Sequence, residues 1–285
     1  MEDLIKTLKD YKVAVVHDWL NGMRGGEKVL EALLEILPDA DLFTLLHEPG
    51  SVSERIENRK IVTSFIDRLP YKTNHYRHYL PLFPTAIELF DFKEYDIIIS
   101  TSHCVAKGVR TPPNTLHISY LHSPMRYVWD MYEDYFSPDQ IGWLSRRIIP
   151  MFANYLRMWD VTSSNRVDHF IANSAHVAKR IMKYYRRSAE VIHPPVDTDL
   201  LPVSAASEEY YLIVSALVPY KRVDLAVRTF NRMGKRLIVI GDGPEKADLH
   251  RTGAKNIEFL DWLPNEQLYK YYSGCKALIF PGEED

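Results

Sequence analysis

The stretch Lys12-Val13-Ala14-Val15-Val16, followed by Asn21-Gly22-Met23-Arg24-Gly25-Gly26-Glu27, decides the fold class of this chain. Its first part is a short apolar run, typical of a buried strand, and its second part is a glycine-rich turn. Over residues 27–37 the apolar side chains recur at three- and four-residue spacing, which predicts a helix. A strand, a turn and a helix in this order form the repeating unit of a parallel α/β sheet.

Strand-like and helix-like stretches continue to alternate through the rest of the chain. The further strands that we expect are residues 41–46, 96–100, 116–120, 169–172, 190–192, 210–214, 236–240, 257–260 and 276–280. This rhythm predicts an α/β protein with two doubly wound sheets. We expect an N-terminal domain of residues 1–196 and a C-terminal domain of residues 210–285. The polar residues 197–209 are the best linker candidate, because few hydrophobic contacts can cross them.

The composition indicates a globular protein with a sizeable core. The 285 residues are 46% hydrophobic and 26% charged, and the formal net charge of −3 does not favour nucleic acid. Cys104 and Cys275 have no metal-ligand spacing, so we expect buried packing residues in a reducing cytoplasm. Residues 1–11 have no long apolar core, so neither a signal peptide nor an anchor is expected.

Gly25 and Gly26 precede the first expected helix. Free backbone N–H groups and the helix dipole favour an anion there, and phosphate is the natural ligand. The alternative is that the two glycines only permit a tight turn. The Gly-x-Gly-x-x-Gly pattern is absent, so dinucleotide binding is not expected.

His122 follows an expected strand and therefore lies at the edge where α/β sheets bind ligands. Its imidazole can hydrogen-bond a substrate or develop charge, and Arg126 in the same loop is a candidate contact for a sugar or an acceptor. The alternative is a structural histidine beside Pro124. His103, after another expected strand, is a weaker candidate of the same type.

Lys221 and Arg222 follow the first expected strand of the second domain. Two cations at that edge can neutralise a diphosphate leaving group. The alternative is an exposed charge pair with Asp224.

Gly241 and Gly243 lie in a strand-to-helix turn, where glycines let the backbone approach a ligand. Pro244 and the missing third glycine argue against a dinucleotide. We expect a nucleotide of another kind, or no ligand.

The chain ends in Phe280-Pro281-Gly282-Glu283-Glu284-Asp285. Residues 276–280 read as an interior parallel strand whose carboxyl end carries an acidic turn at the ligand-binding edge. No closing helix follows, so we expect the second domain to be incomplete. Asp197-Thr198-Asp199 resembles a metal-binding Asp-x-Asp, but turn and cap chemistry explains it better, and we expect no metal.

Taken together, these residues resemble the retaining glycosyltransferases of the GT-B fold, the large family 4, across nearly the whole chain. The resemblance depends on the order of several motifs. They are the Gly25-Gly26-Glu27 turn, the histidine after a strand, Ile171-Ala172-Asn173-Ser174, the Lys221 loop, the Gly-Asp-Gly-Pro turn and the final acidic turn Pro281-Gly282-Glu283-Glu284. Residues 77–129 further resemble mannosyltransferases of polysaccharide and O-antigen assembly.

The resemblance implies two Rossmann-like domains that face a cleft, with the nucleotide diphosphate-sugar held mainly by the second and the acceptor by the first. It implies no cofactor and no metal. Lys221 then binds the donor diphosphate, the Gly25-Gly26 backbone approaches the phosphates, and His122 and Glu284 lie close to the transferred sugar.

Two features depart from the family pattern. Ala216 stands where many relatives have an arginine on the diphosphate. The second family glutamate, expected after Glu284, lies beyond the end of the chain.

We therefore expect a hexosyltransferase that moves mannose from GDP-mannose to a glycan or lipid-linked glycan in cell-surface polysaccharide synthesis. Aromatic and basic residues in 71–92 and 141–159 share helical faces, which suits peripheral contact with the cytoplasmic side of a membrane. The alternative places these aromatic side chains in the domain core. Two other classes stay open, a GT-B sugar-nucleotide epimerase and a non-catalytic nucleotide-sugar binder.

Overall fold

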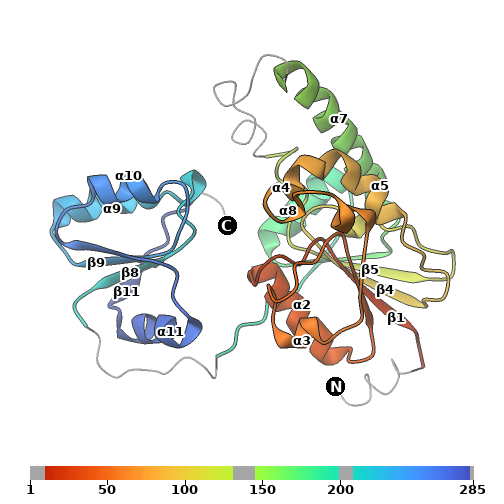
Figure 1. Cartoon of the computed structure of the whole chain (residues 1–285), viewed down its shortest axis with the longest axis horizontal. Helices are drawn as coiled ribbons and strands as arrows, with labels where there is room; N and C mark the ends of the chain where they lie inside the picture. Colours follow the sequence, from red (N-terminus) through yellow and green to blue (C-terminus); the bar gives the residue numbers. More distant parts are fainter. Residues whose placement is uncertain (1–9, 131–144, 199–207, 283–285) are drawn as a thin grey trace. The chain divides into compact units, whose positions relative to one another are not determined.

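The computed structural model describes residues 10–130, 145–198 and 208–282. The chain divides into two compact units, Met1–Pro195 and Val196–Asp285. Each unit is built around one parallel sheet with helices on its faces (Figure 1).

Within the described residues, the sheet of the first unit has seven parallel strands in the order β3-β2-β1-β4-β5-β6-β7. The strands are β1 (Val13–His17), β2 (Asp41–Thr44), β3 (Ile61–Thr63), β4 (Ile97–Ser102), β5 (Leu116–Leu121), β6 (His169–Ala172) and β7 (Glu190–Val191). The α-helices are α2 (Gly25–Ile36), α3 (Glu54–Glu57), α4 (Lys72–His75), α5 (Phe83–Glu88), α7 (Ser145–Ser164) and α8 (Ala175–Tyr185). The 3₁₀ turns are η1 (Phe65–Arg68), η2 (Tyr76–Leu82) and η3 (Ala106–Gly108).

The central strand β1 explains why this sheet has a helical layer on each face. All five of its side chains are buried. Val13 and Val15 pack in one apolar cluster with residues of α2 and α3, whereas Ala14 and Val16 pack in another with residues of α5 and α7. Successive strand side chains point to opposite faces, so a continuous apolar run requires cover on both sides (Figure 1).

In the described part of the second unit, four parallel strands lie in the order β10-β9-β8-β11. They are β8 (Tyr211–Val214), β9 (Leu237–Ile240), β10 (Ile257–Leu260) and β11 (Ala277–Leu278). The helices are η4 (Pro219–Lys221), α9 (Val223–Met233), α10 (Lys246–Thr252) and α11 (Asn265–Gly274). Helix α9 buries Val223, Ala226, Val227 and Phe230 at helical spacing.

The expected α/β fold class and most of the expected strands are confirmed, with ends that move by one or two residues. The strand β3 was not expected, because three half-buried residues give too short a pattern. The expectation that residues 276–280 form an interior strand is wrong for the described part of the chain. There β11 is only two residues long, pairs with β8 alone and exposes Leu278. Cys104 is buried as expected, but Cys275 is only half-buried.

None of the helices in the described ranges combines the length and hydropathy needed to cross a membrane.

Candidate functional site

Three strand ends meet at the carboxyl edge of the first sheet. His17 ends β1, His103 follows β4, and His122 follows β5. The ring centroid of His103 lies 6.3 Å from that of His17 and 6.3 Å from that of His122. Strand order reverses between β1 and β4, and in open α/β sheets ligands bind at such a switch point.

The carboxylate of Asp18 fixes the loop after β4. Its Oδ2 accepts the backbone N–H groups of His103 at 2.6 Å and Cys104 at 2.9 Å. Its Oδ1 accepts those of Val105 and Ala106, both at 2.7 Å. Burial opposes ionisation, but the neighbouring His103 and these donors outweigh it and hold the pKa of Asp18 below its usual value. An ionised, fully buried carboxylate therefore anchors His103.

Glu27 performs a similar task at the glycine turn. Its Oε2 accepts the backbone N–H of Arg24 at 3.0 Å, and its Oε1 lies 3.7 Å from His17 Nε2. Burial raises the pKa of Glu27, but His17 and the backbone donors outweigh it, so the pKa is lowered. The carboxylate therefore holds the start of α2 against β1.

Gly26 lies directly beside His122. A Cβ at position 26 would be 3.6 Å from His122 Nε2 and 3.6 Å from His17 Cε1, and one at Gly25 would meet nothing within 4 Å. Neither glycine has a positive φ. The tight-turn alternative therefore finds no support in the backbone, and the phosphate contact of Gly25 and Gly26 stays a prediction.

His122 carries a neutral imidazole. Burial lowers the pKa of His122 to about 3. Its backbone N–H donates to the Ser102 carbonyl at 2.8 Å, which fixes the loop, whereas Nε2 is buried and has no hydrogen-bond partner among the described residues. A buried polar atom without a partner costs free energy unless a ligand or a water satisfies it.

Arg126 lies in the same loop as His122. Its Nε is 3.4 Å from Ser123 Oγ, which also accepts Arg180 Nη1 at 2.7 Å. Ser123 is buried and Arg126 is half-buried, so the base of the loop is fixed. A ligand contact of Arg126 stays a prediction.

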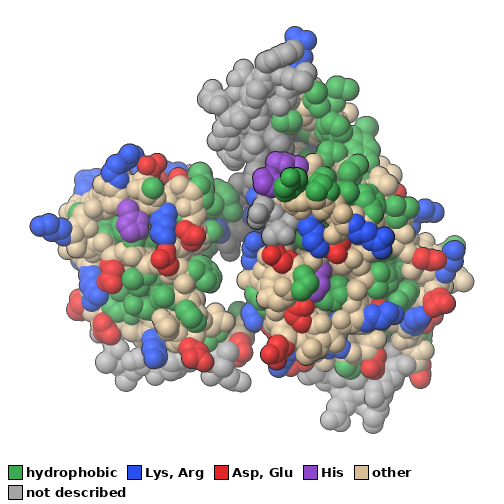
Figure 2. Space-filling model, viewed as in Figure 1, with side chains coloured by type: hydrophobic (Ala, Val, Ile, Leu, Met, Phe, Trp, Pro, Cys, Tyr) green, Lys and Arg blue, Asp and Glu red, His purple; other side chains and the backbone are tan. Residues whose placement is uncertain are grey.

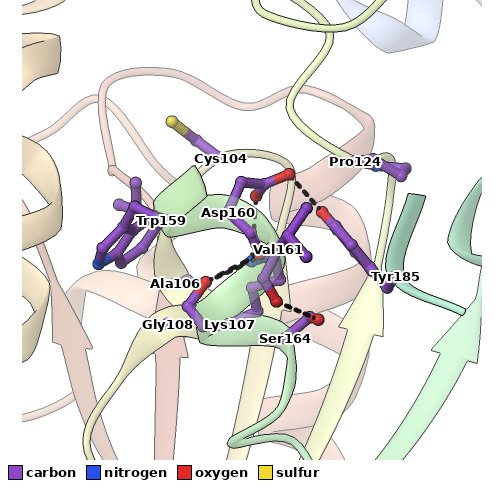
Figure 3. Close-up of polar contacts among 12 residues, drawn as sticks. Cys104, Ala106, Lys107, Gly108, Pro124, Trp159, Asp160, Val161, Ser164 and Tyr185 are labelled. Atoms are coloured by element: carbon purple, nitrogen blue, oxygen red, sulfur yellow. Dashed lines mark hydrogen bonds and ion pairs between the residues drawn. The ribbon is translucent and has the colours of Figure 1, made fainter. Parts of the chain in front are cut away.

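A buried ion pair between Lys107 and Asp160 lies behind these loops, and sequence reasoning missed it (Figure 3). Lys107 Nζ is 3.0 Å from Asp160 Oδ1 and donates to Ser163 Oγ at 2.7 Å. Asp160 Oδ2 accepts Trp129 Nε1 and the Tyr185 hydroxyl, both at 2.8 Å. Burial lowers the pKa of Lys107 from its usual value. The network joins the loops after β4 and β5 to helices α7 and α8.

The sequence carries little signal for this network. Lys107 and Asp160 are far apart in the chain, and the residues directly beside each of them are uncharged. That context was the only available clue, because a charged side chain is almost never fully buried unless it is paired.

In the second unit, Gly241 and Gly243 bring two loops together. Their φ angles are +154° and +159°, and a Cβ at either position would overlap the carbonyl oxygen of Ser215 or Leu217. The Leu217 N–H also donates to the Asp242 carbonyl at 2.9 Å. The partner of these glycines is thus the loop that leads to Lys221, and a direct donor contact stays a prediction.

Lys221 lies at the carboxyl edge of the second sheet. Its Nζ is 5.2 Å from the ring centroid of Phe280, which follows β11. Arg222 begins α9 in a left-handed conformation, and its Nε is 3.2 Å from Asp224 Oδ1. The pairing expected as the alternative for Arg222 is therefore present, and the diphosphate role of both cations stays a prediction.

Two sequence candidates fall outside the described residues, Glu284 and the Asp199 of the Asp-x-Asp stretch. Over residues 10–130, 145–198 and 208–282, no three His, Cys, Asp or Glu side chains come together as a metal site.

Comparisons with known proteins agree with this architecture. The family model of Glycosyltransferase Family 4 matches residues 23–200. No curated protein sequence matches the chain significantly.

Several solved structures share the fold. Anabaena Alr3699/HepE, solved in complex with UDP, superposes with a TM-score of 0.64 at 14% identity, over 96% of this chain and 74% of that one. TarM superposes with a TM-score of 0.58 at 10% identity, over 94% and 79%. AviGT4, a glycosyltransferase involved in avilamycin A biosynthesis, superposes with a TM-score of 0.52 at 16% identity, over 96% and 70%.

The family model covers more than half of the chain, and it includes the glycine turn and the loops of His103 and His122. The structural neighbours are GT-B glycosyltransferases. The chain belongs to glycosyltransferase family 4 and has the GT-B fold.

Proposed function

We propose that the chain is a retaining hexosyltransferase that moves a sugar from a nucleotide diphosphate to a glycan acceptor. The observation that carries this proposal is the neutral imidazole of His122, whose buried Nε2 lacks a partner among the described side chains at the switch point of a family 4 domain. A hydroxyl group of the transferred sugar suits that nitrogen.

The proposed reaction proceeds on one face of the sugar. The bond between the anomeric carbon and the phosphate oxygen breaks, and the electron pair leaves with the nucleoside diphosphate. The acceptor oxygen bonds to the anomeric carbon on the same face, and the leaving phosphate takes its proton. His122 stabilises the oxocarbenium-like transition state through a hydrogen bond, and Glu284 lies near the transferred sugar.

The other candidates bind rather than react. Lys221 and Arg222 offset the diphosphate charge, and the backbone of Gly25 and Gly26 approaches the phosphates. Arg126 contacts the acceptor or the sugar. Gly241 and Gly243 support the donor site by holding the Lys221 loop, in line with their packing against Ser215 and Leu217.

The donor has two candidates. The resemblance over residues 77–129 favours GDP-mannose, whereas the neighbour HepE was solved with UDP and with UDP-glucose. Both donors therefore enter every assay, with and without a chelator, because we propose that no metal is needed.

The acceptor is proposed to be a glycan on a lipid at the cytoplasmic face of a membrane, in cell-surface polysaccharide synthesis. The exposed apolar side chains of helix α7 support a membrane contact. Figure 2 shows hydrophobic surface along this helix. The exposed side chains are Ile148, Met151, Phe152, Tyr155 and Met158. In residues 71–92, by contrast, Tyr71 is exposed, but Tyr76, Phe83 and Phe92 are buried, as the core alternative expected for them.

The test is a transfer assay with each donor and a membrane glycolipid extract, with the anomeric configuration of the product read by NMR. We expect a retained configuration, unchanged rates with EDTA, and a loss of about 10²–10³-fold in His122→Ala, the size typical of losing a transition-state hydrogen bond. His169→Ala, at an exposed position, is the control. If the chain isomerises the nucleotide sugar in the absence of an acceptor, it is an epimerase. If it binds the donor without turnover, it is a non-catalytic binder.

A further inference from the structure

His103 is the second imidazole of the switch point. We propose that His103 accepts a hydrogen bond at Nε2 from a hydroxyl group of a sugar bound at this edge, with Asp18 as its positioning residue. The inference rests on the proposed glycosyl transfer, because it names a further contact of that same site. It extends the sugar site beyond His122.

The geometry of Asp18 fixes the ring. His103 Nδ1 lies 3.1 Å from Asp18 Oδ2, and the Asp18 carboxylate cannot rotate, because four backbone N–H groups hold its two oxygens. A carboxylate at Nδ1 retains the proton on that nitrogen, so the lone pair stays on Nε2. The same logic orients a base in nucleophile–base–carboxylate sites.

The surroundings keep the ring in place and leave part of it accessible. Trp19 packs edge-on against His103, with ring centroids 4.4 Å apart. The side chain of His103 is 29% exposed, whereas that of Asp18 is fully buried. The imidazole therefore extends from a buried anchor toward the surface of the sheet edge.

A second observation points to a ligand here. Across the same edge, His122 Nε2 is buried and lacks a partner in the described part of the chain, and its ring centroid is 6.3 Å from that of His103. Two neutral imidazoles whose ring centroids are this far apart suit neighbouring groups of one small polar molecule.

The protonation states of the two rings suit hydroxyl groups as ligands. Burial lowers the pKa of both His103 and His122, so both are neutral at pH 7. The carboxylates of Asp18 and Glu27 remain ionised, since the pKa of each is lowered. The guanidinium of Arg24 is a further charge that acts on His103. A sugar hydroxyl donates to the lone pair of a neutral imidazole at no charge cost.

The hydroxyl has two possible sources, the transferred sugar of the donor and the acceptor glycan. Calorimetry of the whole chain compares UDP with UDP-glucose and GDP with GDP-mannose, and saturation-transfer NMR measures methyl α-mannoside and methyl α-glucoside. The variants are His103→Ala, His103→Gln, which restores an acceptor oxygen, and His78→Ala at an exposed position as control.

We expect His103→Ala to weaken sugar binding by about 3- to 10-fold, the size of one hydrogen bond, and His103→Gln to recover part of it. The sugar nucleotide should bind more tightly than the bare nucleotide. If His103→Ala reduces only this difference in affinity, the hydroxyl belongs to the donor. A loss confined to the methyl glycosides assigns it to the acceptor. The proposal is overturned if wild type and His103→Ala have equal affinities by both methods. It is also overturned if the wild type binds neither methyl glycoside and binds each sugar nucleotide no more tightly than the bare nucleotide.

The positioning role of Asp18 has its own readout. The ¹⁵N chemical shifts of the His103 ring should show the Nδ1–H tautomer in wild type, and Asp18→Asn should change that tautomer. A wild-type ring protonated at Nε2 contradicts the assignment. If the chain binds nucleotides but His103→Ala does not change sugar binding, this inference fails while the proposed function stands.

Discussion

At the scale of single residues, the switch point combines buried ionised carboxylates with neutral imidazoles. Asp18 and Glu27 stay charged because a neighbouring histidine, His103 or His17, and backbone N–H donors outweigh their burial. His103 and His122 stay neutral because burial lowers the pKa of each more than the nearby carboxylates raise it. Such a site acts through fixed hydrogen-bonding groups, which suits stabilisation of charge that develops on a bound sugar.

The Lys107–Asp160 pair should matter for stability. Lys107→Met leaves the Asp160 carboxylate buried without its cation, and we expect the free energy of unfolding to fall by about 3–5 kcal/mol, measured by urea denaturation. The matched control is Lys60→Met, which removes a surface pair with Asp41 whose lysine is 71% exposed, and should have little effect. Equal losses in the two variants would contradict this view of the buried pair.

At the scale of elements, the sequence was sufficient where a pattern is local. The apolar run of β1, the turn at Gly25 and the spacing within α2 predict one strand–turn–helix unit, and the structure has it. Contacts between distant segments carry no such pattern. Asp18 reaches the loop after β4, and Lys107 reaches α7, only because the fold brings them together. His103 and His122 could therefore be placed at one edge from the sequence, but not His17 or the Asp18 carboxylate.

The packing of Gly243 against the loop after β8 is open to a direct test. Gly243→Ala places a Cβ on the Leu217 carbonyl, so the loop must shift, and we expect a loss of about 1–3 kcal/mol in the free energy of unfolding. Gly25→Ala, whose Cβ meets nothing within 4 Å, should leave stability nearly unchanged. We also expect Gly243→Ala to weaken nucleotide binding, since the displaced loop leads to Lys221. An unchanged melting temperature in Gly243→Ala would refute the packing role.

Helix α7 is expected to contact lipid. The double variant Met151→Glu with Phe152→Glu should reduce sedimentation with phosphatidylglycerol vesicles by about tenfold or more, because two exposed apolar side chains are lost from the contact. Met182→Glu, at an exposed position of α8, is the control. If wild type and the double variant sediment equally, α7 is not the contact.

At the scale of the whole molecule, the free energy of unfolding should decrease at acid pH. Burial lowers the pKa of His117 to about 4, whereas the unfolded chain binds that proton near pH 6.5. Between these values the unfolded state holds more protons, so the free energy of unfolding falls as the pH falls, by about 1.4 kcal/mol per pH unit for one such histidine.

Urea denaturation from pH 7 to pH 4.5 checks this slope. His117→Asn should reduce the slope by the contribution of about one proton, which is about 1.4 kcal/mol per pH unit. The same change at the exposed His169 should leave the slope unchanged. A slope that is equal in wild type and His117→Asn would mean that His117 does not resist protonation in the folded chain.

We propose that this family 4 chain binds a nucleotide diphosphate-sugar through Lys221. Calorimetric titration of the whole chain with GDP-mannose and with UDP-glucose, without metal, tests it most directly. We expect saturable binding of one donor, at least about tenfold weaker in Lys221→Ala because a charge-assisted contact to phosphate is lost, and unchanged in Lys255→Ala at an exposed position. Binding of neither donor, or equal binding by Lys221→Ala and wild type, would show that Lys221 does not hold a donor in this chain.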